Sequence, residues 1–574
     1  MTTMRSGGVE VRDFSFRYPG SETKAVDGVS FSVAPGSFTV VVGPSGSGKT
    51  TLLRCLKPEL SPYGDQEGVI DVKDCDRESG QSNLDIAFVM QNPTNQIVMD
   101  VVWHELAFGL ENSGLSSELI ERRIAETAHF FGISNWIHRK VSELSGGEKQ
   151  ILNLASALIM HPRVLILDEP TAQLDPVAIK HFLNMVQRIH REVGTTIIMS
   201  EHRMRDVFPM ASDVLYLEEG KVSFFGAPRE FASHLLERDD PFKRSLPEAT
   251  RIIWNAHKAL GKANEVIKKP WALPLSVQEA REQLREIMTS SRRHVIESDA
   301  GDYLENAQEH GVVAERLSGG KPVLYAKRLW FRYKSDAPFV LEEMNCALHR
   351  GTIHALVGGN GSGKSTLLYL LAGVLRPQRG NVFRDPDIKV SLLTQSPQAV
   401  FARDTLFDDL MEHRTLGGYD EERVHSIADN LGIRHLLARH PYDLSEGEMQ
   451  KGALAKILLL RPDVLLLDEP VKGLDASNKH EIGELLRRLR DEGMTVLIVT
   501  HDLEFSASIA DECSLIFDGR IVAQDEPSSF FRDNAFYTTD IFRVTRGIVN
   551  SVTTMSEWET MLKIDFEVSR HDLG

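Results

Sequence analysis

Three short motifs occur in the same order twice along this chain of 574 residues. The first set is Gly43–Thr50 (G-P-S-G-S-G-K-T), Leu144–Glu148 (L-S-G-G-E) and Val164–Pro170 (V-L-I-L-D-E-P). The second set is Gly358–Ser365 (G-G-N-G-S-G-K-S), Leu444–Glu448 (L-S-E-G-E) and Val464–Pro470 (V-L-L-L-D-E-P). Two ordered sets of three motifs are too many for coincidence, so we expect one module to be present in two copies.

The spacing of the motifs supports the duplication. The serine of the second motif and the glutamate of the third are 24 residues apart in both copies (Ser145 and Glu169, Ser445 and Glu469). The segment between the first motif's lysine and a later glutamine is 42 residues in one copy and 31 in the other (Lys49 to Gln91, Lys364 to Gln395). This pattern predicts a fixed site with a surface insertion of variable length.

The first motif predicts a phosphate-binding loop between a strand and a helix. Its glycines let backbone N–H groups approach phosphate oxygens, and the following helix presents its positive end to the same anion. We expect the lysines Lys49 and Lys364 to reach the β- and γ-phosphates, and the hydroxyls of Thr50 and Ser365 to coordinate Mg²⁺. The predicted nucleotide-binding residues of these loops are Gly43, Ser45, Gly46, Ser47, Gly48, Lys49, Thr50 and Thr51, and Gly358, Asn360, Gly361, Ser362, Gly363, Lys364, Ser365 and Thr366.

The third motif is a fully apolar run that ends in acids, which is typical of a buried parallel strand. Beside a phosphate loop, Asp168 and Asp468 are expected to hold Mg²⁺ through water. Glu169 and Glu469 come one residue later and are candidates for the general base that polarises the attacking water.

Composition limits the function classes further. The net charge of −17 argues against broad nucleic-acid binding. The four cysteines (Cys55, Cys75, Cys346 and Cys513) show no C-x-x-C spacing, so neither a zinc nor an iron–sulfur site is expected. No apolar run approaches the ~20 residues that span a bilayer, and the N-terminus lacks the apolar core of a signal peptide. We therefore expect other polypeptides to form any transport path.

With these residues the chain resembles a tandem pair of ATP-binding-cassette ATPase domains. The resemblance covers nearly the whole chain except its middle, and predicts a first cassette at 1–240, a tail and linker at 241–320 and a second cassette at 321–574. It implies an α/β fold: two P-loop ATPase domains, each with a mixed or parallel sheet core, an antiparallel β subdomain and a helical signature subdomain. ATP and Mg²⁺ are the implied substrate and cofactor.

The resemblance also implies roles for residues outside the three motifs. Tyr18 and Tyr333 would stack on adenine, and Gln91 and Gln395 would contact Mg²⁺ and the attacking water. His202 and His501 match the histidine that senses the γ-phosphate. Asp175 and Asp475 match a loop that communicates between the cassettes.

The second motif is the family's signature, whose serine begins a helix with N–H groups able to bind an anion. In the family it binds the γ-phosphate of ATP held by the opposite cassette, so the two cassettes of one chain are expected to pair and sandwich two ATPs. The signature residues implied in binding are Ser145, Gly146, Gly147, Ser445 and Gly447.

Three positions depart from the family pattern. Glu446 replaces a signature glycine and would repel a triphosphate if it pointed inward. Ile151 stands where a basic residue is usual, whereas the second copy has Lys451, and Val471 replaces the usual threonine after D-E-P. No primary catalytic group is lost, so we expect two competent sites, and the sequence leaves open whether they are equally active.

The segment after Gln91 (Q-N-P-T-N-Q-I-V-M-D-V-V-W-H-E-L-A-F) resembles the ATPases of energy-coupling-factor importers, which take up vitamins and transition-metal ions in prokaryotes. The sequence around His202 (S-E-H-R) and the tail after the first module fit the same group. The resemblance implies an ATPase on the cytoplasmic face of the membrane, with a membrane scaffold protein and a substrate-binding membrane subunit as partners. The expected docking groove consists of Ile97, Val98, Val101, Val102 and Phe108, although these side chains would equally suit a helix packed on its own core.

Two alternatives remain at this point. Tandem cassettes without membrane spans also act on ribosomes, usually with a long charged linker hairpin. The second alternative is the ATPase of an exporter whose membrane partner is a separate chain. The sequence does not encode the transported compound.

Overall fold

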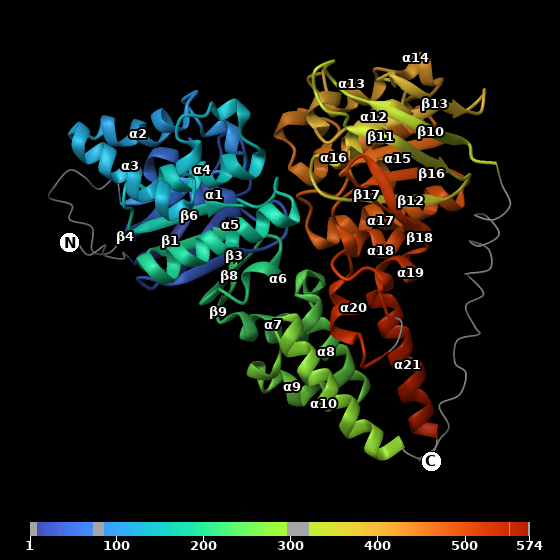
Figure 1. Cartoon of the computed structure of the whole chain (residues 1–574). Coiled ribbons are helices and arrows are strands. Elements are labelled where there is room, and N and C mark those ends of the chain that lie inside the picture. Colours follow the sequence, from blue (N-terminus) through green and yellow to red (C-terminus); the bar gives the residue numbers. More distant parts are fainter. Residues whose placement is uncertain (1–7, 73–84, 296–320, 550–551, 572–574) are drawn as a thin grey trace. The chain divides into compact units, whose positions relative to one another are not determined.

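The computed structural model describes residues 8–72, 85–295, 321–549 and 552–571, and the chain divides into two compact units (Figure 1). The first unit is Met1–Pro247 with Asn264–Leu275, and the second is Glu248–Ala263 with Ser276–Gly574. This division differs from the predicted one, because segment 241–320 is shared between the two units where it is described. Each unit contains one copy of the three motifs.

The core of the first unit is a six-stranded sheet in the order β5-β6-β7-β3-β8-β9. Neighbouring strands are parallel except at the β8–β9 edge, which is antiparallel. Every residue of the three central strands is buried, as expected for parallel strands covered on both faces. The strands are β5 (Ile86–Val89), β6 (Val164–Asp168), β7 (Thr196–Ser200), β3 (Phe38–Val42), β8 (Asp213–Glu218) and β9 (Lys221–Gly226).

A second, antiparallel sheet in the order β2-β1-β4 packs its apolar side against this core. Its strands are β2 (Val26–Val33), β1 (Val9–Arg17) and β4 (Asp65–Val72). Buried and exposed residues alternate along β2, the pattern of a sheet with one solvated face.

The helices of the first unit follow the order that the motifs predict. Helix α1 continues the phosphate loop, and α4 begins at the signature and packs against α2, α3 and α5. The helices are α1 (Lys49–Cys55), α2 (Val102–Asn112), α3 (Ser117–Phe131), α4 (Gly146–Leu158), α5 (Pro176–Arg188), α6 (Met204–Val207), α7 (Pro228–Glu237) and, in the segment Asn264–Leu275, most of α9 (Ala263–Ile267).

The second unit repeats both sheets, with a central order of β14-β15-β16-β12-β17-β18 and an antiparallel order of β11-β10-β13. The predicted fold class is thereby confirmed. The strands are β10 (Leu324–Phe331), β11 (Leu341–Leu348), β12 (Ile353–Val357), β13 (Arg379–Arg384), β14 (Val390–Leu393), β15 (Val464–Asp468), β16 (Thr495–Val499), β17 (Glu512–Phe517) and β18 (Arg520–Asp525). The helices are α12 (Lys364–Leu371), α13 (Leu406–Met411), α14 (Arg414–Gly417), α15 (Glu421–Asn430), α16 (Glu446–Leu458), α17 (Ala476–Asp491), α18 (Leu503–Ile509) and α19 (Pro527–Asp533). In the part of the chain that the structure describes, no helix is both long and apolar enough to span a bilayer.

The second unit also contains a helical bundle that the sequence did not predict. Helices from the middle of the chain pack on helices from its C-terminal end, and their apolar faces share one core. This burial explains why much of segment 241–320 belongs to the second unit. The helices are α8 (Glu248–Ala259), α10 (Val277–Val295), α20 (Asp540–Thr545) and α21 (Met555–His571).

Trp558 is the largest fully buried side chain of this bundle, and its indole N–H donates to the carbonyl of Ile252 at 3.2 Å. We predict that Trp558→Ala lowers the free energy of unfolding of the bundle by about 3–5 kcal/mol, because a large side chain and its hydrogen bond are lost. Hydrogen exchange of α8 and thermal unfolding measure this effect. Trp271, which is 70% exposed, supplies the control. Equal effects of Trp558→Ala and Trp271→Ala would contradict the assigned packing.

Candidate active site

The phosphate loop of the first unit lies between the carboxyl end of β3 and the start of α1. Gly48 precedes the helix with a φ of 95°, and a Cβ there would lie 2.2 Å from the carbonyl oxygen of Ala25. Gly363 has the same role in the second unit, with a φ of 101° and 2.5 Å between such a Cβ and Leu341 Cδ2. Only glycine fits these two positions, so the loops keep the close backbone approach that phosphate binding needs.

The lysine of each loop folds back over it. Lys49 Nζ donates to the carbonyls of Gly43 and Pro44, both at 2.9 Å. Lys364 Nζ donates to the carbonyls of Gly358 and Gly359 at 2.9 and 2.8 Å. Each ammonium is therefore positioned inside the cradle of its own loop, where it can meet an anion.

Two hydroxyls support anion binding independently. Among the described residues, the buried Oγ atoms of Ser47 and Ser362 have no hydrogen-bond partner. They occupy the same position in the two loops. Because an unpaired buried hydroxyl costs free energy, this repeated arrangement fits a bound group that supplies the missing partner.

Asp168 ends β6 and joins three elements of the first unit. Its Oδ1 accepts from Thr50 Oγ1 of α1 at 3.1 Å and from Ser200 Oγ of β7 at 2.8 Å. Burial raises the pKa of Asp168 above its ordinary value, opposed by the Ser200 hydrogen bond. Burial likewise raises the pKa of Asp468, and the hydrogen bond from Ser365 opposes it.

This donor set fits Mg²⁺. In each unit one carboxylate lies against the hydroxyl that ends the phosphate-loop motif, and Mg²⁺ is commonly bound by one or two oxygen ligands together with substrate phosphates. Among the described residues, no three His, Cys, Asp or Glu side chains form a dedicated metal cluster. An ion completed by phosphate oxygens is therefore the arrangement that these residues suit.

Glu169 follows directly, and its backbone φ of 44° lies in the left-handed region. Its carboxylate is held from two sides: His202 Nε2 lies 2.8 Å from Oε1, and Gln91 Nε2 donates to Oε2 at 3.2 Å. Strained backbone of this kind persists where the surroundings over-determine it, as at many active sites. The structure thus brings three predicted catalytic residues of the first unit into direct contact.

Glu469 has the same strained conformation, with a φ of 52°, but different contacts. His501 Nδ1 lies 2.9 Å from its Oε1, and the His501 backbone N–H donates to Oε2 at 3.4 Å. Gln395 is exposed, and among the described residues it has no hydrogen bond to Glu469. Burial alone would raise the pKa of Glu469, but the hydrogen bond from His501 and the nearby positive charges lower it overall.

The predicted adenine-stacking tyrosines lie beside the loops. The hydroxyls of Tyr18 and Tyr333 are 3.1 Å from Thr51 Oγ1 and Thr366 Oγ1, respectively. Both rings are exposed. Each tyrosine is therefore placed next to the helix that follows its own phosphate loop.

The signature serines begin helices, as predicted. Ser145 caps α4 and Ser445 caps α16, each in a reciprocal capping box with the glutamate three residues later. Glu446 lies near the turn at Gly473, where a Cβ would be 2.8 Å from Glu446 Oε2. The predicted communicating residues Asp175 and Asp475 cap α5 and α17.

Sequence reasoning did not identify Ser200, Glu201 or Thr171. Ser200 bonds Asp168 and also accepts from the backbone N–H of Glu169 at 2.9 Å. Glu201 is buried and contacts Thr171. The available signal was an acid directly after a largely apolar run (T-I-I-M-S), because a carboxyl group rarely follows a buried strand without partners.

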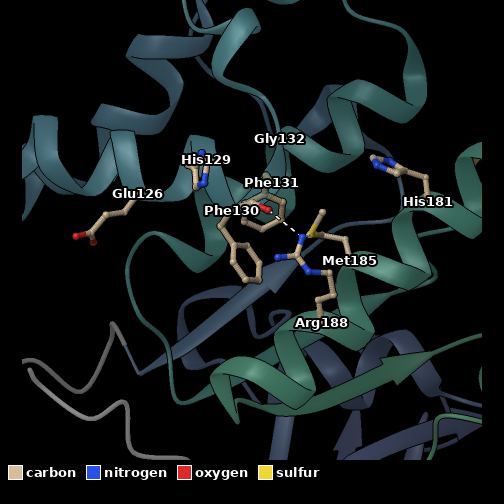
Figure 2. A pocket seen from close by; sticks show the side chains of 8 residues that line it. All are labelled: Glu126, His129, Phe130, Phe131, Gly132, His181, Met185 and Arg188. Carbon is tan, nitrogen blue, oxygen red and sulfur yellow. Dashed lines mark hydrogen bonds between the residues drawn. The ribbon is translucent and has the colours of Figure 1, made fainter.

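A separate hollow of about 580 Å³ lies on the first unit, at the C-terminal end of α3 and beside α5 (Figure 2). Arg188 occupies part of it, with its guanidinium 4.5 Å from the centre of the Phe130 ring and a 3.1 Å hydrogen bond to the Phe130 carbonyl. No predicted site residue lines it. Its lining is Glu126, His129, Phe130, Phe131, Gly132, His181, Met185 and Arg188.

Comparison with known proteins supports the geometric reading. The sequence pattern of the ABC transporter family matches residues 26–172 and 341–472. A protein of Bacillus anthracis that is named as an ABC transporter ATP-binding protein is 37% identical to this chain. The alignment covers 98% of this chain and 98% of that protein.

The chain belongs to the ABC transporter family. It is a tandem ABC ATPase. The HMP/thiamine import ATP-binding protein YkoD of Bacillus subtilis is 28% identical, covering 91% of this chain and 92% of that protein. The solved structure of RNase-L Inhibitor aligns with a TM-score of 0.54 at 20% identity, covering 90% of this chain and 91% of that one, and shares the fold.

The contacts of Glu469 in the second cassette predict a pH effect. In His501→Ala the hydrogen bond and the positive charge are lost while burial remains, so the pKa of Glu469 rises. Because a base must be unprotonated to act, the acid limb of the ATPase profile should move to higher pH. The measurement is kcat against pH in a chain that also carries Glu169→Gln. The control is His480→Ala, at an exposed position on α17, which should not move the acid limb of the pH profile. An acid limb that stays at the same pH in His501→Ala would refute the prediction.

Proposed function

We propose that this tandem ABC ATPase powers a membrane importer of the energy-coupling-factor type that takes up a vitamin or a transition-metal ion. The observation that carries the proposal is the alignment, over nine-tenths of both chains, with a relative named for HMP/thiamine import. The proposed location is the cytoplasmic face of a prokaryotic membrane, beside a scaffold protein and a substrate-binding membrane subunit.

The proposed chemistry follows from the arrangement of the strand ends. The loop amides, with Lys49 and Lys364, bind and orient the triphosphate, and Thr50 and Asp168, or Ser365 and Asp468, hold Mg²⁺. Mg²⁺ bound there supplies positive charge that neutralises the phosphate oxygens.

Glu169 and Glu469 are the proposed bases that accept a proton from the attacking water. In the first cassette, His202 and Gln91 hold the two carboxylate oxygens of Glu169 in a defined direction. In the second, the ring and the backbone N–H of His501 both contact the Glu469 carboxylate. Ser145, Gly146, Gly147, Ser445 and Gly447 remain proposed nucleotide contacts.

The proposed docking surface follows Gln91 in the first cassette. Glu105 is buried and accepts the backbone N–H groups of Val98 and Met99 at 3.0 and 2.8 Å, which fixes this segment. Val98 is 65% exposed, whereas Val102 is fully buried and belongs to the core. Ile97, Val101 and Phe108 are half-buried, so the surface is narrower than the five residues predicted.

Copurification tests the proposal. The full chain, expressed with its neighbouring genes, should be isolated with small hydrophobic membrane proteins, and Val98→Asp should weaken that association because a charge enters an apolar contact. Val374→Asp, at a position 68% exposed in the second unit, is the matched control. Isolation with ribosomes instead, or equal association of both variants, would contradict this function.

A further inference from the structure

Glu201 is a buried acid next to the proposed base, and no motif explains it. It follows the last residue of β7 and is 4% exposed. Its Oε1 accepts from Thr171 Oγ1, and its Oε2 accepts the backbone N–H groups of His202 and Arg203 at 2.9 and 3.2 Å. The carboxylate therefore fixes the turn that presents His202.

Thr171 closes a ring of contacts around the site. It lies two residues after Glu169 and is itself buried. The side chains of Glu169 and His202 are in contact, and the backbone N–H of His202 donates to Glu201. Glu201 in turn accepts from Thr171, and the short stretch of chain between Glu169 and Thr171 closes the ring. The direction of the Glu169 side chain is thus coupled to Glu201.

The second cassette provides an internal comparison because it has different residues at both positions. Val471 replaces Thr171, and Thr500 replaces Glu201. The hydroxyl of Thr500 accepts from the backbone N–H of Asp502 at 3.1 Å. The N–H of His501 then donates to Glu469 itself.

The two bases consequently use their oxygens differently. In the first cassette Glu201 accepts the His202 N–H, and Oε2 of Glu169 accepts from Gln91. In the second, Oε2 of Glu469 accepts the His501 N–H, and Gln395 is exposed. The buried acid thus accompanies a base that is hydrogen-bonded by histidine and glutamine, whereas in the second cassette the ring and the backbone N–H of a histidine contact the base.

We propose that Glu201 is a positioning residue of the first cassette: by binding the His202 backbone N–H, it leaves the Glu169 carboxylate available to Gln91. The proposal rests on the proposed role of Glu169 as the base. It also assigns the different hydrogen bonding of the two bases to the Thr171–Glu201 pair, in whose place the second cassette has Val471 and Thr500. Glu201 itself accepts hydrogen bonds from three donors, and none of these donors belongs to Glu169.

The decisive variant is Thr171→Val with Glu201→Thr, which installs the second cassette's own pair. This pair is compatible with the fold because the same strand end carries it in the other copy. A crystal structure of the variant should show the His202 N–H donating to Glu169 and Gln91 Nε2 no longer within hydrogen-bond distance of Oε2. An unchanged Gln91–Glu169 contact would overturn the proposal without any reference to turnover.

Kinetics supply the second readout, in full chains carrying Glu469→Gln so that only the first site is measured. Gln91→Ala and the Thr171→Val/Glu201→Thr pair should each lower kcat about 10-fold to 100-fold, as misplacement of a catalytic group does. The KM for ATP should change less than about 2-fold, because loss of positioning acts on the transition state rather than on ground-state binding. A chain that carries Gln91→Ala together with the Thr171→Val/Glu201→Thr pair should have the same kcat as the slower of the two separate variants, because both changes remove the same contact.

Multiplying effects would mean that Gln91 and Glu201 act independently, which refutes the proposal. A parallel rise in KM and loss of thermal stability would assign Glu201 a purely structural role and also refute it. Thr500→Ala, at the matching position of the second cassette in the otherwise natural chain, should leave kcat within about 2-fold because its hydroxyl does not contact the base. Failure of the underlying assignment is seen separately: if Glu169→Gln retains full turnover in the same background, the base is misassigned whatever Glu201 does.

Discussion

A buried carboxylate at the end of a parallel strand is the contact on which each cassette depends. Asp168 receives hydrogen bonds from Thr50 at the start of α1 and from Ser200 at the end of β7, so one side chain joins three elements. Burial makes the charged form of this acid costly, and the two hydroxyl donors offset part of that cost. Asp468 has the same relation to Ser365. Because the carboxyl ends of β3, β6 and β7 lie at one edge of the sheet, the phosphate loop, the acids and the histidine meet there.

The two cassettes share this frame but differ in how it holds the base. The first uses Gln91 and His202, supported by Glu201, while the second uses both the ring and the backbone of His501. Two positions at which the second signature helix differs from the first contact residues other than the base. Glu446 lies near the turn at Gly473, and Lys451 Nζ donates to Glu481 at 2.6 Å. These differences mean that the same two proposed catalytic acids have different surroundings in the two cassettes.

Short motifs predicted the main features of the site because each motif residue has one dominant local requirement. Gly48 must adopt a positive φ, Lys49 must lie inside its loop, and Asp168 must end a buried strand.

Residues that act through tertiary contacts were not predicted. Nothing in the sequence near Glu201 shows that Thr171, 30 positions earlier, lies against it. The helical bundle of the second unit was not predicted for the same reason, because the core around Trp558 joins segments that are about 300 residues apart. Gln395 matched its family position, yet it is exposed, and the sequence alone did not show this.

Glu169 and Glu469 are the proposed bases at the strand ends, and the mechanism of both cassettes depends on them. The most direct test is steady-state ATP hydrolysis by the full chain carrying Glu169→Gln, Glu469→Gln or both, alongside ATP binding by the same proteins. The account predicts that each single change lowers hydrolysis, that the double change lowers it by about 100-fold or more, and that ATP is still bound. Hydrolysis at the natural rate in the double variant would contradict it.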